Sequence, residues 1–375
     1  MKSYVDPWKV EGEVDYNKLI NEFGVEKITP QIIKKLPQPP HKFLELGFFS
    51  FHRDLGIILD QHKKGIPFAL ATGRGPSGKV HIAHLLIWKF AKWLQDSFDC
   101  NLYFQITDDE KFLFNRELEF NEVQEYAKEN ILDIAAVGFN PDKTFIFKNT
   151  EYTKIYKMAA QISKTTTINT VRDIFGESVE RNPGAMFFPC IQAAHLMMAN
   201  FIEGPTPVIV PMAIDQDPYI RISRDAAPKL GFPKPGAIHS KFLPAITGMD
   251  GKMSASKKET AIFLDDSESD VDEKIKKHAL TAGRATIEEQ RKLGGEADKC
   301  VVYKWLTLLE PLSEGKKIYS DCYSGKILCK EDKERLSARI NEVLEEHRKA
   351  KMKAEKLVDK FMYSGRLAKK AWEYK

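Results

Sequence analysis

The stretch "PFALATGRGPSGKVHIAHLL", Pro67–Leu86, decides the fold. Its first six residues form a short apolar run that stops at glycine, which is typical of a buried parallel strand. After the glycine-rich turn, apolar residues recur at helical spacing, and a second apolar run of strand length, "NLYFQIT", ends just before Asp108. The order strand, glycine turn, helix and strand predicts a βαβ unit, and hence a parallel sheet.

A second half of the same sheet is predicted further along the chain. "TPVIVPMAI", Thr206–Ile214, is another strand-like run, and the segment before it, about 108–205, is mostly helical by pattern. The expected fold is therefore an α/β doubly wound parallel sheet with a helical insertion. We expect an N-terminal helical extension at 1–50, the sheet domain at 51–259, an all-α domain at 260–356 and a C-terminal helix at 357–375.

The composition is that of an ordinary globular protein, with 43% hydrophobic and 29% charged residues in 375. No run of about 18 apolar residues could span a bilayer, and the N-terminus lacks the apolar core of an export signal. The five cysteines are scattered and never form a C-x-x-C pair. We therefore expect reduced thiols, a cytoplasmic location, no membrane partner and no structural zinc site.

The net charge of +4 hides a basic C-terminus. From Arg348 to Lys375 the chain carries a net charge of +7, while the first 347 residues carry −3. Such a tail is either a solvated helix face or the electrostatic footprint of a nucleic acid, and charge alone favours the first interpretation.

Three glycines, Gly73, Gly75 and Gly78, lie between the first strand and the helix, and His81 and His84 follow them. Glycine lets backbone N–H groups approach a phosphate closely, and the N-terminus of the next helix favours negative charge. Residues three apart on a helix share a face, so both imidazoles can point at one ligand. The pattern is neither G-x-x-x-x-G-K-[ST] nor the strict dinucleotide fingerprint. We expect a phosphate site of another kind.

A metal site is the alternative for the two histidines. Its third ligand would have to come from Asp108, Asp109 or Glu110, which follow the neighbouring strand. A metal would leave the glycine-rich turn unexplained, so we expect none.

A second basic element is the loop "GKMSASKK", Gly251–Lys258. Lys252, Lys257 and Lys258 stand among small residues, as suits a mobile clamp that neutralises phosphate oxygens. A lone basic loop is usually solvated surface, and its position after the second half-sheet is what favours a function.

Together these elements carry a resemblance. "PSGKVHIAH" resembles the H-x-G-H element of the class I aminoacyl-tRNA synthetases, and "KMSAS" resembles their lysine loop. The longer strings are similar to tryptophanyl-tRNA synthetases of the archaeal and eukaryotic type: "TGRGPSGKVHIAH", "QITDDEKFL", "FPCIQAA", "AIDQDPYIRISRDAAPKLGFPKP" and "GKMSAS", with "VDPWKV" and "DYNKLINEFG" near the N-terminus. The resemblance covers most of the chain. It implies a Rossmann-like catalytic domain, a helical anticodon-binding domain and a homodimer.

The resemblance also implies a reaction. The carboxylate of tryptophan would attack the α-phosphate of ATP, pyrophosphate would leave, and the acyl group would pass to the terminal adenosine of a tRNA. Positioning and charge stabilisation dominate such chemistry. His81 and His84 would face the ATP phosphates, and Gly73 and Gly75 the adenosine.

The lysine loop would complete the catalytic site. By similarity, Lys252 with the hydroxyls of Ser254 and Ser256 would close on the β- and γ-phosphates, and Met253 would lie beside the nucleotide. Mg²⁺ would accompany the ATP and share its charge.

Four further residues carry over as the amino-acid pocket: Gln105, Glu110, Gln192 and Gln216. A buried indole N–H needs an acceptor, and the ammonium group needs carboxylate or amide oxygens. The alternative is that these polar residues at strand ends only form turns.

Two residues depart from the family pattern. Ala83 stands where glycine is usual, and its methyl group could crowd the adenine. Ala71 stands where the family typically has a tyrosine that helps to define the indole pocket. Either another aromatic residue fills that space, with Phe68, Phe104 and Phe112 as candidates, or the pocket is looser.

Three rival functions stay open at this point. A tyrosyl-type synthetase is the nearest, a catalytically impaired RNA-binding paralogue is the second, and a small-molecule nucleotidyltransferase is the third. The last would have no use for a helical domain and a basic tail, which the resemblance implies contact tRNA. The segment "LVDKFMYSGRLAKKAW" either joins that contact or packs back on the catalytic domain.

Overall fold

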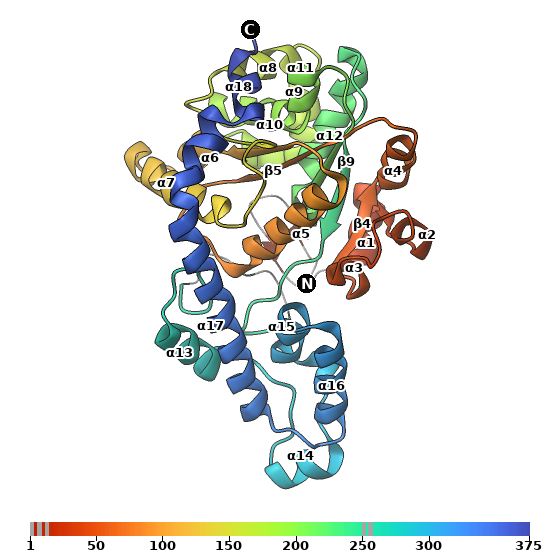
Figure 1. Cartoon of the computed structure of the whole chain (residues 1–375), viewed down its shortest axis with the longest axis vertical. Helices are drawn as coiled ribbons and strands as arrows, with labels where there is room; N and C mark the ends of the chain where they lie inside the picture. The colour runs from red at the N-terminus through yellow and green to blue at the C-terminus, as the bar shows by residue number, and fades with distance from the viewer. Residues whose placement is uncertain (1–3, 6–9, 12–14, 250–252, 254–257) are drawn as a thin grey trace.

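A computed structural model describes residues 4–5, 10–11, 15–249, 253 and 258–375 (Figure 1). At its centre lies a seven-stranded sheet, whose strands follow in space as β3 (Glu26–Lys27), β4 (Phe49–Arg53), β9 (Gly236–Ser240), β8 (Val208–Ala213), β5 (Ala69–Arg74), β6 (Leu102–Ile106) and β7 (Thr144–Lys148). The five strands from β9 to β7 are parallel, and β4 runs antiparallel to both β9 and β3. The predicted doubly wound α/β fold is confirmed.

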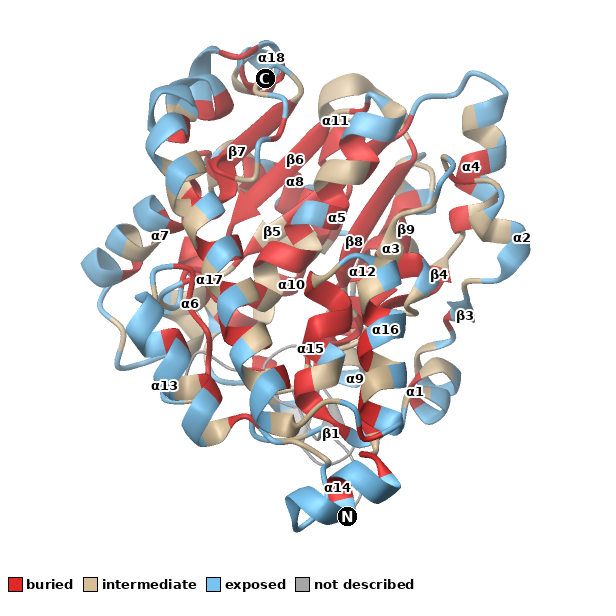
Figure 2. Cartoon of the chain, turned by 60° about the horizontal axis from the view of Figure 1, so that its bottom comes forward, coloured by how far each residue is buried: buried red, intermediate tan, exposed pale blue. Residues whose placement is uncertain are grey.

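Both faces of the central strands are buried, as Figure 2 shows in red. Because side chains alternate along a strand, neighbouring residues enter different cores. Leu70 and Phe104 pack into the cluster that contains α5 (Ile82–Phe98). Ala71 and Tyr103 pack into the second cluster, with α8 (Lys154–Ser163), α10 (Pro183–Leu196) and α12 (Asp217–Ala226).

The N-terminal segment contains more than helices. It has a two-stranded ribbon and three short helices, followed by a fourth helix after β4: β1 (Tyr4–Val5), β2 (Val10–Glu11), α1 (Tyr16–Phe23), α2 (Pro30–Ile33), α3 (Lys42–Glu45) and α4 (Leu55–Lys63). The expectation of a purely helical extension at 1–50 is wrong, because β3 and β4 extend the main sheet. Phe51 pairs with His239 of β9, far along the chain, and this pairing makes the segment a strand.

The insertion at about 108–205 is mostly helical, as expected. Besides α8 and α10 it contains α6 (Asp108–Phe114), α7 (Phe120–Ala135), α9 (Ile168–Phe175), η1 (Gly176–Val179) and α11 (Met198–Glu203), and the turns η2 (Ile214–Gln216) and η3 (Ala227–Leu230) come after it. It contains in addition the edge strand β7, parallel to β6, so the sheet continues into this segment. The first strand begins and ends two residues later than the expected run Pro67–Thr72 and reaches Arg74.

From Glu268 onward the described residues form helices and loops without a named strand. The elements are α13 (Glu268–His278), α14 (Ile287–Leu293), η4 (Ala297–Lys299), α15 (Val301–Leu309), α16 (Leu312–Tyr323), α17 (Cys329–Ala354), η5 (Glu355–Leu357), the π-helical turn η6 (Lys360–Ser364) and α18 (Arg366–Glu373). In Figure 1 the long helix α17 runs from this helical region back to the sheet domain. The assignment of domain functions stays a prediction.

The last helix packs on the sheet domain. Leu367, Ala368 and Ala371 of α18 belong to the second core cluster, and the Tyr152 hydroxyl donates to the carbonyl of Ala371 at 2.8 Å. Within the described ranges, no helix combines the length and the apolar character that a bilayer crossing requires.

Candidate active site

A cavity of about 1060 Å³ opens at the carboxyl ends of the parallel strands. The chain leaves β5 toward β6 on one side, while β8 lies on its other side, so the strand order reverses at β5. Open α/β sheets bind their ligands at such a switch point. Gly73, Thr107 and Ala213 line the cavity from the ends of the three strands.

The structure brings the two predicted histidines together at this cavity. His81 is the N-cap residue of α5 and His84 lies in its first turn, and their ring centroids are 3.9 Å apart. Both line the cavity, and His81 is 7% exposed. A ligand at the N-terminus of α5 would therefore meet two imidazoles side by side.

Arg74 sets the tautomer of His84, although no pattern in the sequence points to this residue. Its Nη1 lies 3.1 Å from Nε2 of His84, and its Nε donates to Asn130 Oδ1 at 3.0 Å. A guanidinium has donors only, so Nε2 of His84 must accept. The neutral ring then carries its proton on Nδ1. Burial lowers the pKa of Arg74 to about 10, which keeps it charged at neutral pH.

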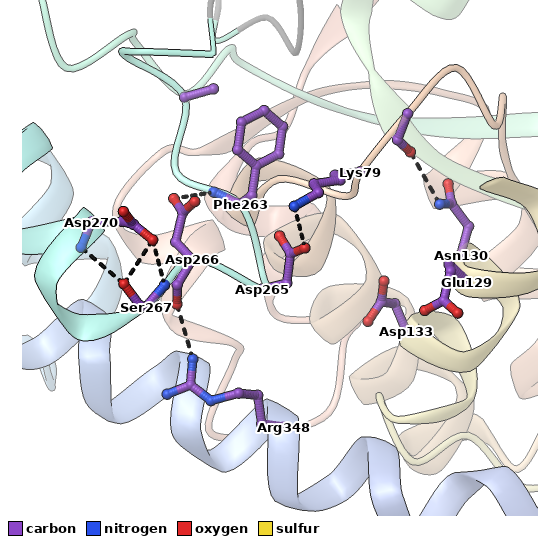
Figure 3. Close-up of polar contacts among 12 residues, drawn as sticks. Lys79, Glu129, Asn130, Asp133, Phe263, Asp265, Asp266, Ser267, Asp270 and Arg348 are labelled. Carbon is purple, nitrogen blue, oxygen red and sulfur yellow. Dashed lines mark hydrogen bonds and ion pairs between the residues drawn. The ribbon is translucent and has the colours of Figure 1, made fainter.

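Asn130 of α7 also holds the glycine-rich loop. Its Nδ2 donates to the carbonyl of Gly78 at 3.1 Å, and the next residue, Lys79, forms an ion pair with Asp265 at 2.7 Å (Figure 3). Arg348 of α17 donates to the carbonyl of Asp266 at 3.0 Å. The loop is therefore tied to α7 and to the segment that precedes α13.

The two predicted glycines lie where a side chain would have no room. A Cβ on Gly73 would come within 3.1 Å of the carbonyl oxygen of Gln105, its partner on β6. A Cβ on Gly75 would come within 2.1 Å of Cε of Lys111 and 3.0 Å of Oε2 of Glu110. Because Gly75 has no side chain, the side chain of Lys111 can lie against this loop. Lys111 also lines the cavity, although no pattern in the sequence points to it.

Three of the four predicted pocket residues line the cavity: Glu110, Gln192 and Gln216. Glu110 is 8% exposed and accepts from the hydroxyl of Thr107 at 2.7 Å. The fourth, Gln105, is not one of the described residues that line the cavity. It is fully buried, and its Nε2 donates to Asn149 Oδ1 at 2.9 Å.

Asn149 belongs to a buried network around Asp109. Its Nδ2 donates to Asp109 Oδ1 at 2.7 Å, and the Tyr156 hydroxyl donates to Asp109 Oδ2 at 3.1 Å. Burial raises the pKa of Asp109 to about 7. The neighbouring Asp108 bonds to Gln124 and Thr150. Both aspartates thus bond to neighbouring side chains, and the described residues contain no group of three or more His, Cys, Asp or Glu able to hold a metal.

Most of the predicted lysine loop lies outside the described residues, including Lys252, Ser254, Ser256 and Lys257. Met253 is described: it is 4% exposed, lines the cavity, and its backbone N–H donates to the carbonyl of Leu243 at 3.3 Å. Lys258 also lines the cavity, so described residues of this segment border the site.

The three aromatic residues expected to fill the space beside Ala71 do not do so. Ala71 projects into the second core cluster, whereas Phe68 and Phe104 belong to the first, on the other face of the sheet. Phe68 lies three residues before Ala71, and Phe104 lies one residue after Tyr103, the partner of Ala71 on β6. Because successive side chains point to opposite faces, both phenylalanines belong to the other face. Phe112 is 46% exposed. The alanine Ala83 lines the cavity and packs against the first cluster.

Comparisons with known proteins agree with this geometry. Residues 63–345 match the family described as tRNA synthetases class I (W and Y). The tryptophan–tRNA ligase of Pyrococcus abyssi is 49% identical, with 98% of this chain and 96% of that protein covered. The chain belongs to the tryptophanyl-tRNA synthetase family. A relative from Saccharolobus solfataricus is 45% identical over 98% of this chain and 97% of its own length.

Solved structures of the tryptophanyl-tRNA synthetase family share the fold over nearly the full length. The enzyme of Plasmodium falciparum superposes with a TM-score of 0.88 at 36% identity, covering 95% of this chain and 99% of that chain. The enzyme of Encephalitozoon cuniculi, described as bound to tryptophan, has a TM-score of 0.85 at 34% identity and covers 93% and 98%.

Proposed function

We propose that this chain activates L-tryptophan with ATP and transfers it to the 3′ end of its tRNA. The observation that carries this proposal is that one cavity holds both the histidine pair at the glycine-rich turn and the polar residues Glu110, Gln192 and Gln216. A phosphate and an amino acid bound there would lie next to each other. The tryptophan carboxylate oxygen attacks the α-phosphorus, and pyrophosphate leaves. A hydroxyl of the terminal adenosine then attacks the acyl carbon, and AMP leaves.

The first step needs donors where negative charge develops on the phosphates. His84, with its proton on Nδ1, and His81 beside it supply such donors at the N-terminus of α5. Gly73 and Gly75 line the cavity and would lie against the adenosine. Lys252 closes on the departing pyrophosphate, and Ser254, Ser256 and Met253 lie with it on the same loop.

We also propose that Mg²⁺ enters with the nucleotide. The donor set supports this assignment, because Asp108 and Asp109 bond to neighbouring side chains and the described residues offer no carboxylate cage. Mg²⁺ is usually bound through substrate phosphates and water together with one or two carboxylates. When bound, it would neutralise part of the phosphate charge.

The helical region and the basic tail are proposed to contact the tRNA. Arg366, Lys369 and Lys370 are exposed on α18, and the distal helix α14 exposes Ile287 and Leu293 at 65% and 60%. Lysine and arginine neutralise phosphates, while exposed apolar side chains can pack against unpaired bases. A homodimer is proposed on the family resemblance. The free cysteines support a cytoplasmic location.

One assay tests the activation step: exchange of labelled pyrophosphate into ATP with each amino acid. We expect exchange with tryptophan and much weaker exchange with tyrosine. No exchange with any amino acid would contradict the enzyme and favour the RNA-binding paralogue, and faster exchange with tyrosine would favour a tyrosyl-type enzyme. Lys252→Ala should slow exchange and leave the tryptophan KM nearly unchanged, whereas a large rise of that KM would place Lys252 in the pocket.

A further inference from the structure

His195 is a buried histidine at the amino-acid end of the cavity that has no part in the function described so far. It lies on α10, three residues after Gln192, so the two side chains share one helix face. Both line the cavity. Gln192 is partly exposed, whereas His195 has no exposed surface, so His195 marks the deeper end.

The tautomer of His195 follows from its hydrogen bond to the backbone of β6. Its Nε2 lies 3.1 Å from the carbonyl oxygen of Tyr103, and a carbonyl oxygen can only accept, so Nε2 carries the proton. Burial lowers the pKa of His195 to about 4, so the ring is neutral at physiological pH. Its other nitrogen, Nδ1, is therefore a hydrogen-bond acceptor.

That acceptor has no hydrogen-bond partner among the described residues, and Nδ1 is buried. Buried polar atoms are nearly always paired, and leaving one unpaired costs about 1–3 kcal/mol. An orphaned acceptor on the wall of a cavity is therefore a sign that a ligand supplies the missing donor.

The surroundings of His195 are apolar and aromatic. Its ring centroid is 6.0 Å from that of Phe147, and its Cε1 is 3.8 Å from where a Cβ on Gly73 would stand. Phe188 and Tyr219, with ring centroids 6.0 Å apart, line the same cavity. A flat apolar ring fits such a site, and a ring with one N–H would satisfy Nδ1 of His195.

The other acceptors of the cavity suit a different group of the substrate. Glu110 and Gln216 line the cavity in the turns that follow β6 and β8. They suit the end of the substrate that carries the reacting carboxylate and its neighbouring ammonium. An ammonium carries three donors and a charge, which a carboxylate and amide oxygens satisfy. Two buried amide oxygens also lack a partner among the described residues. Oε1 of Gln192 belongs to a residue that lines the cavity one helix turn before His195, whereas Gln105 is not one of the described lining residues.

We propose that Nδ1 of His195 accepts the hydrogen bond from the indole N–H of tryptophan and so selects this amino acid. This inference rests on the proposed function and names the residue that reads the side chain. Ala71 projects onto the same sheet face as α10, and with Gly73 it leaves only a methyl group and a hydrogen there. His195 supplies from the helix the polar contact that β5 cannot supply.

The test compares tryptophan with β-(3-benzothienyl)alanine, whose sulfur replaces the indole N–H at nearly the same size. His195→Leu removes the acceptor, and His195→Asn keeps an amide oxygen at the position of Nδ1. In pyrophosphate exchange, we expect the wild-type preference for tryptophan in kcat/KM to fall about tenfold or more in the leucine variant, as for one lost buried hydrogen bond. The asparagine variant should keep most of it.

A structural role for His195 predicts a different result. If the leucine variant loses kcat/KM equally for both amino acids, so that its preference is unchanged, or if the asparagine variant loses the preference as fully as the leucine variant does, the proposal is overturned. The ATP KM should be unchanged in both variants.

A measurement on the wild-type protein covers the case in which the variants do not fold. In protein labelled with ¹⁵N-histidine, tryptophan should shift the Nδ1 resonance of His195 toward the hydrogen-bonded range, and benzothienylalanine should not. Equal shifts with both ligands contradict the proposal. If the wild-type enzyme shows no exchange at all, the proposed function fails, while this titration still reports on His195.

Discussion

Arg53 and Asp217 form a buried, two-pronged ion pair that joins the antiparallel edge of the sheet to the segment that lines the cavity. Nε and Nη2 of Arg53 each lie 2.7 Å from a carboxylate oxygen of the fully buried Asp217. Burial alone would raise the pKa of Asp217, but hydrogen bonds from Arg53 and His239 outweigh it and hold that pKa below its ordinary value. Since Asp217 directly follows Gln216, the pair fixes the backbone beside a pocket residue.

Replacing Arg53 by alanine should therefore affect both stability and tryptophan binding. The change leaves the Asp217 charge buried without its main partner, which typically costs about 3–5 kcal/mol. We expect a clear fall in Tm, and in the folded protein a higher KM for tryptophan with little change in the KM for ATP. Thermal unfolding and pyrophosphate exchange measure the two effects.

A matched control is the exposed ion pair between Lys35 and Asp60, which are 2.6 Å apart with side chains 29% and 50% exposed. Exposed pairs contribute about 0–1 kcal/mol, so Asp60→Asn should change neither Tm nor the tryptophan KM appreciably. Equal effects of Asp60→Asn and Arg53→Ala would show that the buried pair has no special role.

Arg74→Lys should slow the activation step without weakening tryptophan binding. A lysine keeps the charge but cannot bond at once to His84, Asn130 and the carbonyl of Lys79, as the guanidinium does. His84 then loses the contact that sets its tautomer, and a misplaced donor costs on the order of 10–100-fold in rate. Single-turnover formation of the adenylate measures the rate.

The control is Arg224→Lys on α12. Arg224 is partly buried and pairs with Asp54 at 2.6 Å, but it is not one of the described residues that line the cavity. Its substitution should leave the activation rate unchanged. If Arg74→Lys behaves like Arg224→Lys, Arg74 does not position His84.

The parallel half of the fold could be predicted from the sequence because its signals are local. The apolar run before Gly73 and the run that ends at Ile106 are continuous, as strands buried on both faces must be. The strand β4 gave no such signal: Phe49–Arg53 becomes a strand by pairing with β9, nearly two hundred residues away. The edge strand β7 was hidden in a segment whose flanks are helical.

The part of the candidate site that has a local sequence pattern could also be predicted, and the part that depends on distant contacts could not. His81 and His84 stand beside glycines, so spacing and composition point to them. His195 stands alone in an apolar helix, and its chemistry depends on the carbonyl of Tyr103, 92 residues earlier. Arg74 lies inside the quoted stretch, but only its folded contact with His84 shows what it does.

The pH dependence of stability should reveal Asp109. Burial raises its pKa in the folded protein to about 7, against 3.8 ordinarily. Between these values the folded state keeps a proton that the unfolded chain has released, so this group's contribution to stability falls as pH rises from about 4 to 7. The maximum slope is about 1.4 kcal/mol per pH unit.

Asp109→Asn should remove this slope. The asparagine oxygen can accept from Asn149 and from the backbone N–H of Glu110, while its amide can donate to Tyr156. We expect the Tm of the variant minus the Tm of the wild type to increase as the pH is raised from 4.5 to 7. A constant difference in Tm over this range would mean that Asp109 does not titrate there.

Substitutions of two lysines on α17 should distinguish an effect on tRNA binding from an effect on folding. Lys351 lies 2.8 Å from Oδ1 of the buried Asp133 of α7, which also contacts His347 at 3.2 Å. Lys353, two residues on, is exposed. If the basic tail contacts tRNA phosphates, Lys353→Ala should weaken tRNA binding at unchanged Tm. It should also reduce the slope of log K against log salt by about 1.

Lys351→Ala removes the same charge from the same helix but should act mainly on stability, because Asp133 loses its closest cation. Its Tm should fall, and its tRNA affinity at a permissive temperature should stay near that of the wild type. Filter binding of tRNA over a range of salt concentrations, together with thermal unfolding, distinguishes the two variants. Identical salt slopes for Lys353→Ala and the wild type would show that this part of the tail is a solvated helix face.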